Sequence, residues 1–310
     1  MTTYAPIALF TYARADHTRD AVESLLKNAE AASTDLYVFS DGPKTEGKIE
    51  AVAENRRYIR TIQGFKSVHI IEREKNWGLA NSLIAGITEV VNQYGKVIVV
   101  EDDLVLSPYF LQFMNDALNK YEREVRVSAI TAYCPVTDNR LPATFFLRYF
   151  HCWGWATWKR GWELLNQDTK YLLRKMRWKT RKFNLDGAVG NYGMLYCQKV
   201  GLVDSWFIRL YASFFLAGKL TLFPGRSLVS NHGLDGSGTH CVDAGGNDGK
   251  AAELVSGPII LPDIPVAEDE NAYQIISRTL KARQPKMGVV KSSCLRFKSF
   301  IRRLLYIDCA

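Results

Sequence analysis

The stretch Val97-Ile98-Val99-Val100-Glu101-Asp102-Asp103 decides the fold prediction, because four branched apolar residues end abruptly in three carboxylates. A continuous apolar run predicts a central strand of a parallel sheet, buried on both faces. In open α/β sheets, ligands bind outside the carboxyl ends of such strands. Three adjacent acids there repel one another unless a cation or a hydroxyl-rich ligand compensates their charge. The alternative is a solvated turn in which Asp103 caps a helix at about 109–121.

The chemistry of the three acids indicates which ligand would fit them. Hard oxygen ligands suit Mg²⁺ or Mn²⁺, which keep part of their water and share a substrate phosphate. The stretch therefore predicts a metal–nucleotide site at the mouth of a sheet.

Strands and helices alternate through the first half of the chain. The apolar patterns predict strands at 7–12, 36–40, 68–72 and 97–100, and helices at 16–31, 48–62 and 79–94. Repeated units of this length are typical of a parallel sheet with helices on both faces. No Gly-x-Gly-x-x-Gly turn follows the first strand and no Walker sequence is present, so a dinucleotide-binding or P-loop domain is not supported.

The second half is less regular. We expect strands at 128–132, 220–223 and 228–229, a helix at 206–216, and a surface helix or loop in the basic stretch 174–182. Residues 145–162 are dense in aromatics and glycine. The glycine-rich segment 230–249 reads as a long loop, and a loop of that length is often a functional lid.

Composition and charge narrow the class of protein. The 310 residues, 47% of them hydrophobic, are enough for a large core. No charge-free window long enough to span a membrane and no secretory signal are visible, and six scattered cysteines predict reduced thiols in the cytoplasm. Residues 278–310 hold nine basic residues and one acid, while residues 1–277 balance at 31 of each. The net charge of +8 therefore lies in the tail, and we expect no nucleic-acid partner.

The tail itself has an amphipathic pattern at 295–307. Its apolar residues recur at helical spacing and basic residues fill the remaining face. This pattern predicts a helix lying on an anionic membrane surface. A helix packed on the protein body, with its cations reaching solvent, is the alternative.

Four segments, taken in order, carry a resemblance to a known family: Phe10-Thr11-Tyr12-Ala13-Arg14, Ser40-Asp41-Gly42, Asn76-Trp77-Gly78-Leu79-Ala80 and Glu101-Asp102-Asp103. Together they resemble GT-A fold glycosyltransferases, in particular family 2 and the N-acetylglucosaminyltransferase I group. The resemblance implies a nucleotide-sugar donor, with a UDP-sugar favoured, and a metal bound by the acid motif as Mn²⁺ or Mg²⁺.

The same resemblance implies roles for individual residues. Asp103 is expected to bind the metal, Asp102 the ribose hydroxyls, and Glu101 the donor sugar or ribose. Further donor contacts are expected at Arg14, Asp41, Asn76, Trp155 and His232. The alternatives are a surface cation for Arg14, a turn-forming residue before Gly-Pro for Asp41, a core residue for Trp155 and a solvated loop residue for His232. Trp155 belongs to a Trp-Gly-Trp turn similar to the wall of the sugar site in inverting transferases, and His232 begins a segment that resembles the mobile loop over the donor phosphates.

The resemblance also implies a catalytic base. Asp204-Ser205-Trp206 is similar to a Trp-Asp-Asp-Trp stretch whose Asp deprotonates the acceptor, although Val203 and Ser205 depart from it. The alternative for Asp204 is to cap the helix at 206–216, which Ser205 could also do. One base with one metal implies a single displacement with inversion at the anomeric carbon.

The sequence therefore predicts an α/β protein with a GT-A type nucleotide-binding sheet, helices on both faces, at 1–125. An acceptor-binding and catalytic half of the same domain follows at 126–277, and a basic tail at 278–310 contains the amphipathic helix at 295–307. The expected function is transfer of a hexosyl or N-acetylhexosaminyl group to a lipid-linked or surface glycan during polysaccharide biosynthesis, by a cytoplasmic enzyme peripheral on the inner face of the cell membrane. A nucleotidyltransferase acting on sugar phosphates and a non-catalytic carbohydrate- or lipid-binding protein remain the alternatives.

Overall fold

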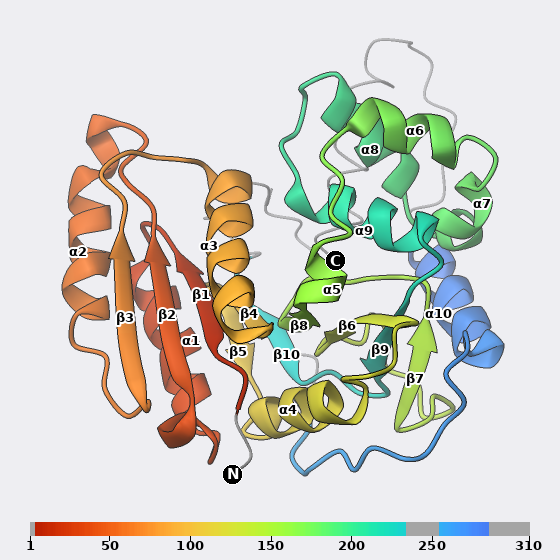
Figure 1. The fold of residues 1–310 in the computed structure, drawn as a ribbon, viewed down its shortest axis with the longest axis horizontal. Coiled ribbons are helices and arrows are strands. Elements are labelled where there is room, and N and C mark those ends of the chain that lie inside the picture. Colours follow the sequence, from red (N-terminus) through yellow and green to blue (C-terminus); the bar gives the residue numbers. More distant parts are fainter. Residues whose placement is uncertain (1–3, 234–253, 285–310) are drawn as a thin grey trace.

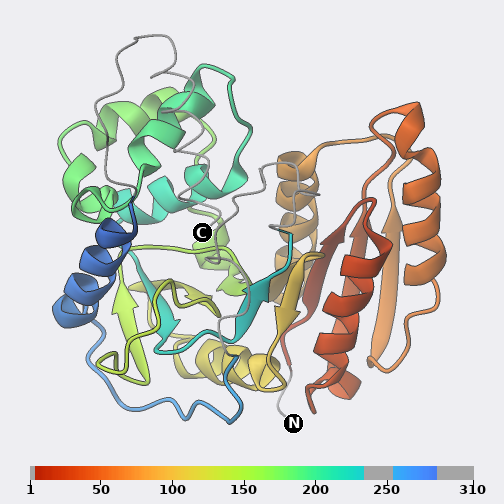
Figure 2. The same ribbon diagram turned by 180° about the vertical axis from the view of Figure 1, so that it is seen from behind.

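The computed structural model describes residues 4–233 and 254–284 (Figures 1 and 2). One eight-stranded sheet organises the chain, in the order β3-β2-β1-β4-β8-β6-β9-β7, and a two-stranded sheet pairs β10 with β5. The strands are β1 Ile7–Thr11, β2 Asp35–Ser40, β3 Ser67–Glu72, β4 Lys96–Glu101, β5 Leu104–Leu106, β6 Val127–Thr131, β7 Thr144–Leu147, β8 Trp155–Trp158, β9 Leu220–Pro224 and β10 Val229–Asn231.

Ten α-helices and three short 3₁₀ helices connect these strands within the described residues. The α-helices are α1 Ala15–Leu26, α2 Ile49–Ile59, α3 Leu79–Tyr94, α4 Phe110–Lys120, α5 Lys159–Trp162, α6 Thr169–Met176, α7 Thr180–Phe183, α8 Asn191–Lys199, α9 Trp206–Leu216 and α10 Glu270–Arg283. The 3₁₀ helices are η1 Ala31–Ser33, η2 Glu46–Lys48 and η3 Leu185–Gly187.

The first half forms the predicted parallel sheet. Strands β3, β2, β1 and β4 pair in parallel, so their carboxyl ends meet at one edge. In the register, Phe10 of β1 is the partner of Glu101 on β4, and Thr11 is the partner of Ser40 on β2. The acids that follow β4 therefore lie beside the residues that follow β1.

The second half continues the same sheet with mixed strand directions. β8 inserts antiparallel between β4 and β6, β9 is parallel to β6, and β7 is antiparallel to β9. The strand that precedes the three acids is therefore parallel to its neighbour on one side only. The sheet also runs without interruption across residue 125.

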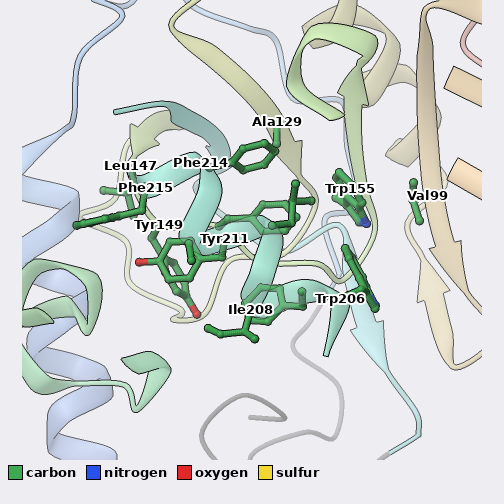
Figure 3. Packing of buried hydrophobic residues seen from close by; sticks show 14 of the residues in the cluster. Val99, Ala129, Leu147, Tyr149, Trp155, Trp206, Ile208, Tyr211, Phe214 and Phe215 are labelled. Atoms are coloured by element: carbon green, nitrogen blue, oxygen red, sulfur yellow. The ribbon is translucent and has the colours of Figure 1, made fainter. Parts of the chain in front are cut away.

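Helices cover both faces of the sheet, as the alternating pattern predicts. Ala8 and Phe10 of β1 pack with α3 and α9, whereas Ile7 and Leu9 pack with α1, α2 and α4 in a second cluster. Figure 3 shows the first cluster, in which aromatic side chains of α9 pack against the second half of the sheet. Each strand of the central sheet thus contributes alternate side chains to two cores.

The sequence pattern did not predict β5, β7, β8, α8 or α10, whereas β10 overlaps the strand predicted at 228–229. β5 directly follows Asp103 and pairs antiparallel with β10, with Asn231 opposite Leu104. No helix is capped by Asp103, since Tyr109 stands at the start of α4. The alternative of a solvated turn that caps this helix is therefore wrong.

Local signals fix several helix boundaries. Gly78 and Gly95 flank α3 and both have positive φ, which explains why its predicted and observed bounds agree. The helix predicted at 16–31 ends at Leu26, because the amide of Asn28 donates to the carbonyls of Ser24 and Leu25 and terminates it. The basic stretch at 174–182 folds as the end of α6 and the start of α7.

Other predictions meet the limits of the described residues. Cys134 and Cys197 are buried free thiols. None of the helices in residues 4–233 and 254–284 has the length and apolar content that a bilayer crossing needs. The predicted amphipathic tail helix and most of the glycine-rich loop lie outside the described residues.

Candidate functional site

The three acids lie at the carboxyl end of β4, between the large sheet and the small one. Glu101 is the last residue of β4, and Asp102 and Asp103 form the turn into β5. Asp102 is buried and its Oδ2 accepts a hydrogen bond of 3.4 Å from the backbone N–H of Tyr12. This contact joins the end of β4 to the end of β1. We call these three residues the acid cluster.

Arg14 is the cation of the acid cluster. It lies at the start of α1, and its Nη2 donates both to Oδ1 of Asp102 and, at 3.1 Å, to Oδ2 of Asp103. Its Nη1 is buried and has no hydrogen-bond partner among the described residues. Burial works against the charged guanidinium, but Asp102 and Asp103 outweigh it and raise the pKa of Arg14 above its ordinary value. Arg14 therefore stays charged and holds the two aspartates together.

One guanidinium does not balance three carboxylates. Burial, followed by the negative charges of Asp103 and Asp102, raises the pKa of Glu101 to about 8. Burial also raises the pKa of Asp102, although Arg14 opposes this shift. Like-charge crowding in a poorly hydrated site has this effect on carboxyl groups. The acid cluster therefore favours binding of a further positive charge.

His232 and Gly233 close the acid cluster from the side of β10. The backbone N–H of His232 donates to the carbonyl oxygen of Asp103 at 2.8 Å, while its exposed ring lies 3.2 Å from Oγ of Ser230. A Cβ built on Gly233 would overlap Oδ2 of Asp103 and lie 3.0 Å from Nη1 of Arg14. The structure thus brings His232 next to Asp103, and it gives Gly233, which the sequence prediction included only as part of the loop segment after His232, a close contact with Asp103 and Arg14.

The residues present fit a divalent cation that takes most of its ligands from elsewhere. Among the described residues no group of three or more His, Cys, Asp or Glu side chains is arranged to hold a metal ion by itself. The side chain of Asp103, however, is 18% exposed, so a cation can reach its carboxylate from solvent. One protein carboxylate completed by water and substrate phosphates is a usual Mg²⁺ arrangement.

Asp41 and Asn76 meet each other, in a role that the sequence did not predict. The carboxylate of Asp41 is buried and accepts hydrogen bonds of 2.9–3.1 Å from the backbone N–H groups of Gly42, Trp77 and Gly78. The amide of Asn76 donates to the carbonyl of Gly42 at 2.8 Å. Both side chains therefore fasten the loop after β2 to the loop after β3. The direct donor contact expected of Asp41 is corrected to this positioning role, because its oxygens are already engaged.

Trp77 and Arg73 form an exposed stack in these loops. The guanidinium of Arg73 lies 3.6 Å from the ring centroid of Trp77, whose side chain is 46% exposed. Arg56 supports the stack by donating to the carbonyls of Arg73 and Asp41, at 2.6 and 3.3 Å. An open aromatic face thus lies at the carboxyl edge of β2 and β3. In the sequence analysis Trp77 was only part of the Asn76-Trp77-Gly78 turn, and no ligand contact was predicted for it.

Trp155 is a core residue, so the donor contact predicted for it is wrong on this structure. Its side chain is 0% exposed and stacks on Trp206 with 5.5 Å between ring centroids (Figure 3). It is also the register partner of Val99, two residues before Glu101. Its position supports the sheet beneath the acid cluster, while burial keeps it from contacting a ligand.

Asp204 lies in the loop before α9 and is the exposed acid of that region. Its side chain is 61% exposed, and Oδ1 accepts from Nη2 of Arg209 at 3.0 Å. Ser205, not Asp204, caps α9 by accepting from the N–H of Ile208. Since Trp206 packs on Trp155, the start of α9 is held against the sheet near the end of β4. Asp204 is thus free of the capping role and open to solvent.

A separate cavity of about 210 Å³ lies away from these residues, between β7, α7, α9 and α10. Its lining residues are Arg148, Tyr149, Lys182, Leu185, Phe215, Glu268 and Tyr273. None of them belongs to the acid cluster or to the loops after β2 and β3, so the cavity is not part of the site described here.

Comparison with known proteins relates the geometry to a family. A family model described as "Glycosyl transferase family 2" matches residues 7–192, which include the acid cluster and Arg14 but not Asp204 or His232. No curated protein matches the chain. TarS from S. aureus aligns at 16% identity over 54% of this chain and 26% of its own, with a TM-score of 0.31.

A second solved structure, a UDP-glucose pyrophosphorylase complexed with UDP-glucose, aligns at 12% identity over 53% of this chain and 80% of its own, with a TM-score of 0.30. This chain spans about a quarter of the TarS chain. Structural similarities this low do not establish a shared activity.

Proposed function

The chain belongs to glycosyl transferase family 2, and we propose that it moves a sugar from a nucleotide-sugar donor to an acceptor hydroxyl with inversion at the anomeric carbon. The observation that carries this proposal is the acid cluster at the carboxyl end of β4, with Arg14 on one side and Gly233 on the other. Ligands of α/β sheets bind at this edge.

The donor side of the site is assigned to the first half of the chain. A nucleotide base is proposed to lie near the exposed Trp77–Arg73 stack, and the ribose near Asp102 and Glu101, with a UDP-sugar as the favoured donor. Burial and the charges of Asp103 and Asp102 raise the pKa of Glu101 to about 8 while no cation is bound, and a cation at Asp103 would lower it again. Glu101 is therefore proposed to accept a hydrogen bond from a hydroxyl of the donor as a carboxylate when the metal is bound. Asp41 and Asn76 would act indirectly, by fixing the loops that carry Trp77.

A divalent metal is proposed at Asp103. Mn²⁺ or Mg²⁺ bound there would neutralise charge on the leaving pyrophosphate as a Lewis acid. Arg14 keeps the carboxylates of Asp102 and Asp103 oriented, and the partial exposure of the Asp103 side chain supports access by a cation. His232, next to Gly233, is proposed to contact the donor phosphates.

Asp204 is proposed as the base that takes the proton of the acceptor hydroxyl. Its exposure supports access by an acceptor, and its pairing with Arg209 supports a fixed orientation. The acceptor is proposed to be a lipid-linked or surface glycan in polysaccharide biosynthesis, with the protein peripheral on the inner face of the cell membrane.

A screen of nucleotide-sugars tests the donor and the metal together. We expect one class of donor to raise the Tm of the wild type in the presence of Mn²⁺, and to be hydrolysed slowly without acceptor. Asp103→Ala is expected to lose both effects while keeping its fold, since Asp103 lies at the surface of the site. Asp20→Ala, an exposed acid on α1, is the matched control.

Three results would contradict parts of this proposal. Hydrolysis and transfer that continue at wild-type rates with a chelator would exclude the metal at Asp103. Donor binding without hydrolysis or transfer to any glycan acceptor would identify a non-catalytic binding protein. Formation of a nucleotide-sugar from a sugar phosphate would instead identify a nucleotidyltransferase.

A further inference from the structure

A helical cap covers α9 on the side away from the sheet. The cap comprises residues 169–202, with α6, α7 and α8, and these helices lie together above α9 in Figure 1. Leu172, Leu173 and Met176 of α6 are buried in the same core cluster as α9. The opposite faces of the cap helices are left to solvent.

The cap is strongly basic, although the body of the chain is neutral in sum. It contains eight basic residues and one acid, Asp186, which gives a net charge of +7. All eight cations are exposed. Two of them, Arg181 and Lys182, pair with Asp186 and Glu270. The other six, which have no acidic partner in the part of the chain that the structure describes, are Lys170, Arg174, Lys175, Arg177, Lys179 and Lys199.

The same surface exposes aromatic and aliphatic side chains. Trp178 is 83% exposed, and Tyr171, Tyr196, Val200 and Leu202 are exposed as well. Cations lie beside three of these rings: Arg177 over Trp178 at 4.5 Å, Arg174 and Lys175 over Tyr171 at 5.7 Å, and Lys199 over Tyr196 at 5.8 Å. On α6, the spacing of Tyr171, Arg174 and Lys175 places them on one face, opposite the buried residues.

We propose that the cap docks on the surface of an anionic phospholipid bilayer. Unpaired cations attract anionic headgroups, and Trp and Tyr side chains settle at the headgroup level because one end of each ring is apolar and the other polar. A basic surface that carried only short polar side chains besides its cations would bind a soluble polyanion as well as a bilayer. The exposed Trp178, Val200 and Leu202 favour the lipid surface.

The position of the cap gives the docking a consequence for the active site. Leu202 precedes Asp204 by two residues, so the edge of the cap leads into the loop that carries the proposed base. A bilayer held against the cap would present the headgroup of a lipid-linked acceptor beside this loop. The consequence rests on the proposed function, whereas the docking does not.

Vesicle binding of the full-length protein tests the proposal without any donor or acceptor. We expect cosedimentation with phosphatidylcholine vesicles that contain phosphatidylglycerol, and little with phosphatidylcholine alone. The triple variant Arg174→Gln, Lys175→Gln, Arg177→Gln is expected to bind at least about tenfold more weakly, because each basic residue contributes separately at an anionic surface. Trp178→Ala should weaken binding further and should lose the blue shift of tryptophan fluorescence on vesicle addition.

Matched variants separate the cap from general charge and from the tail. One control is the triple variant Lys27→Gln, Lys48→Gln, Arg123→Gln, which removes three exposed cations outside the cap. The other control is Ile260→Ala, which removes an apolar side chain as exposed as that of Trp178. Both should bind vesicles like the wild type. Arg296→Gln, Lys298→Gln, Arg302→Gln makes the same change in the tail and should leave the contribution of the cap intact.

Three outcomes would overturn the proposal. The first is unchanged vesicle binding by a folded cap triple variant. The second is a tail variant that no longer binds vesicles, together with a cap variant that binds them like the wild type. The third is cap-dependent binding to a soluble polyanion such as heparin with no binding to vesicles. Since no donor is present, none of these results depends on whether the protein transfers a sugar.

Discussion

Gly233 and Asp103 are packed so closely that residue 233 has no room for a side chain. A Cβ there would lie 2.9 Å from Cβ of Asp103 and overlap its Oδ2, and it would lie 3.0 Å from Nη1 of Arg14. Only glycine fits at position 233 while the carboxylate of Asp103 keeps its position. Residues 130 positions apart in the chain thus define one wall of the acid cluster.

Gly233→Ala is expected to displace the carboxylate of Asp103 and to lower transfer activity strongly. Overpacking at a close contact costs about 1–3 kcal/mol of unfolding free energy, so Tm should fall as well. The diagnostic measurement is the concentration of Mn²⁺ needed for donor-dependent stabilisation, which should rise. Gly257→Ala is the control, because a Cβ at that position meets no atom within 4 Å. Equal Mn²⁺ requirements in both variants would show that this contact does not shape the metal site.

Stability should fall with rising pH in the neutral range. The pKa of Glu101 is about 8 in the folded protein, against an ordinary value of 4.5. Between these values the folded state holds a proton that the unfolded chain has released, so the free energy of unfolding decreases as pH rises, by at most about 1.4 kcal/mol per unit. Burial lowers the pKa of His151 to about 3, which acts in the opposite direction, but only up to about pH 6.5.

The window from pH 6.5 to 8 therefore isolates the acid cluster, and denaturant unfolding across it is the measurement. In Glu101→Gln, the free energy of unfolding should decrease less steeply with rising pH, and the decrease that remains should come from Asp102. Glu163→Gln, an exposed glutamate on the surface, should behave like the wild type. A wild-type stability that does not change across this window would contradict the charge crowding described for Glu101.

Asp204→Asn tests the proposed base. The variant keeps the size and the hydrogen-bonding capacity of the side chain but cannot take up a proton near neutral pH. Transfer should fall by about two to four orders of magnitude in kcat, with the donor KM nearly unchanged. Asp263→Asn, an exposed aspartate paired with Lys120, is the control. Normal turnover by Asp204→Asn would move the assignment to Asp186, or to Asp235 and Asp243, which lie outside the described residues.

Asp41→Asn distinguishes the positioning role of this residue from a direct donor contact. An amide cannot accept all three backbone hydrogen bonds, so we expect a loss of about 1–3 kcal/mol in unfolding free energy and faster hydrogen exchange at Trp77 and Gly78. Donor affinity should fall together with stability. Weaker donor binding at full stability would restore the direct contact, and Asp20→Asn serves as the surface control.

The sequence predicted the elements whose signals are local. Leu79–Tyr94 and Trp206–Leu216 have the predicted bounds, because Gly78 and Gly95 flank the first and Ser205 caps the second. The strand before Glu101 was predicted from its apolar run alone. Fold class and the helices on both faces followed from the same alternation of strands and helices.

The remaining features depend on contacts that are distant in the chain. β5 has only three residues, and it is a strand because it pairs with β10. No local sequence pattern indicates this pairing. Trp155 is a tryptophan, the residue type expected in the wall of a sugar site, but its ring is covered by Trp206. Asp41 was predicted to contact the donor, and only the fold shows that the backbone N–H groups of Gly42, Trp77 and Gly78 bind its oxygens. The basic stretch 174–182 was visible in the sequence, but its charge cancels in the sum over residues 1–277, and only the fold shows that it shares one surface with the exposed aromatic residues.

The pairing of β5 with β10 also sets the order in which the protein becomes functional during synthesis. Domains form from the N-terminus as the chain emerges, and contacts between distant segments close last. Strands β1–β4 and Arg14 are available long before residues 229–233 leave the ribosome. A nascent chain or a proteolytic fragment that ends short of these residues would hold the parallel strands and the three acids but lack the wall opposite Asp103, so it would remain catalytically silent until the last strand is added.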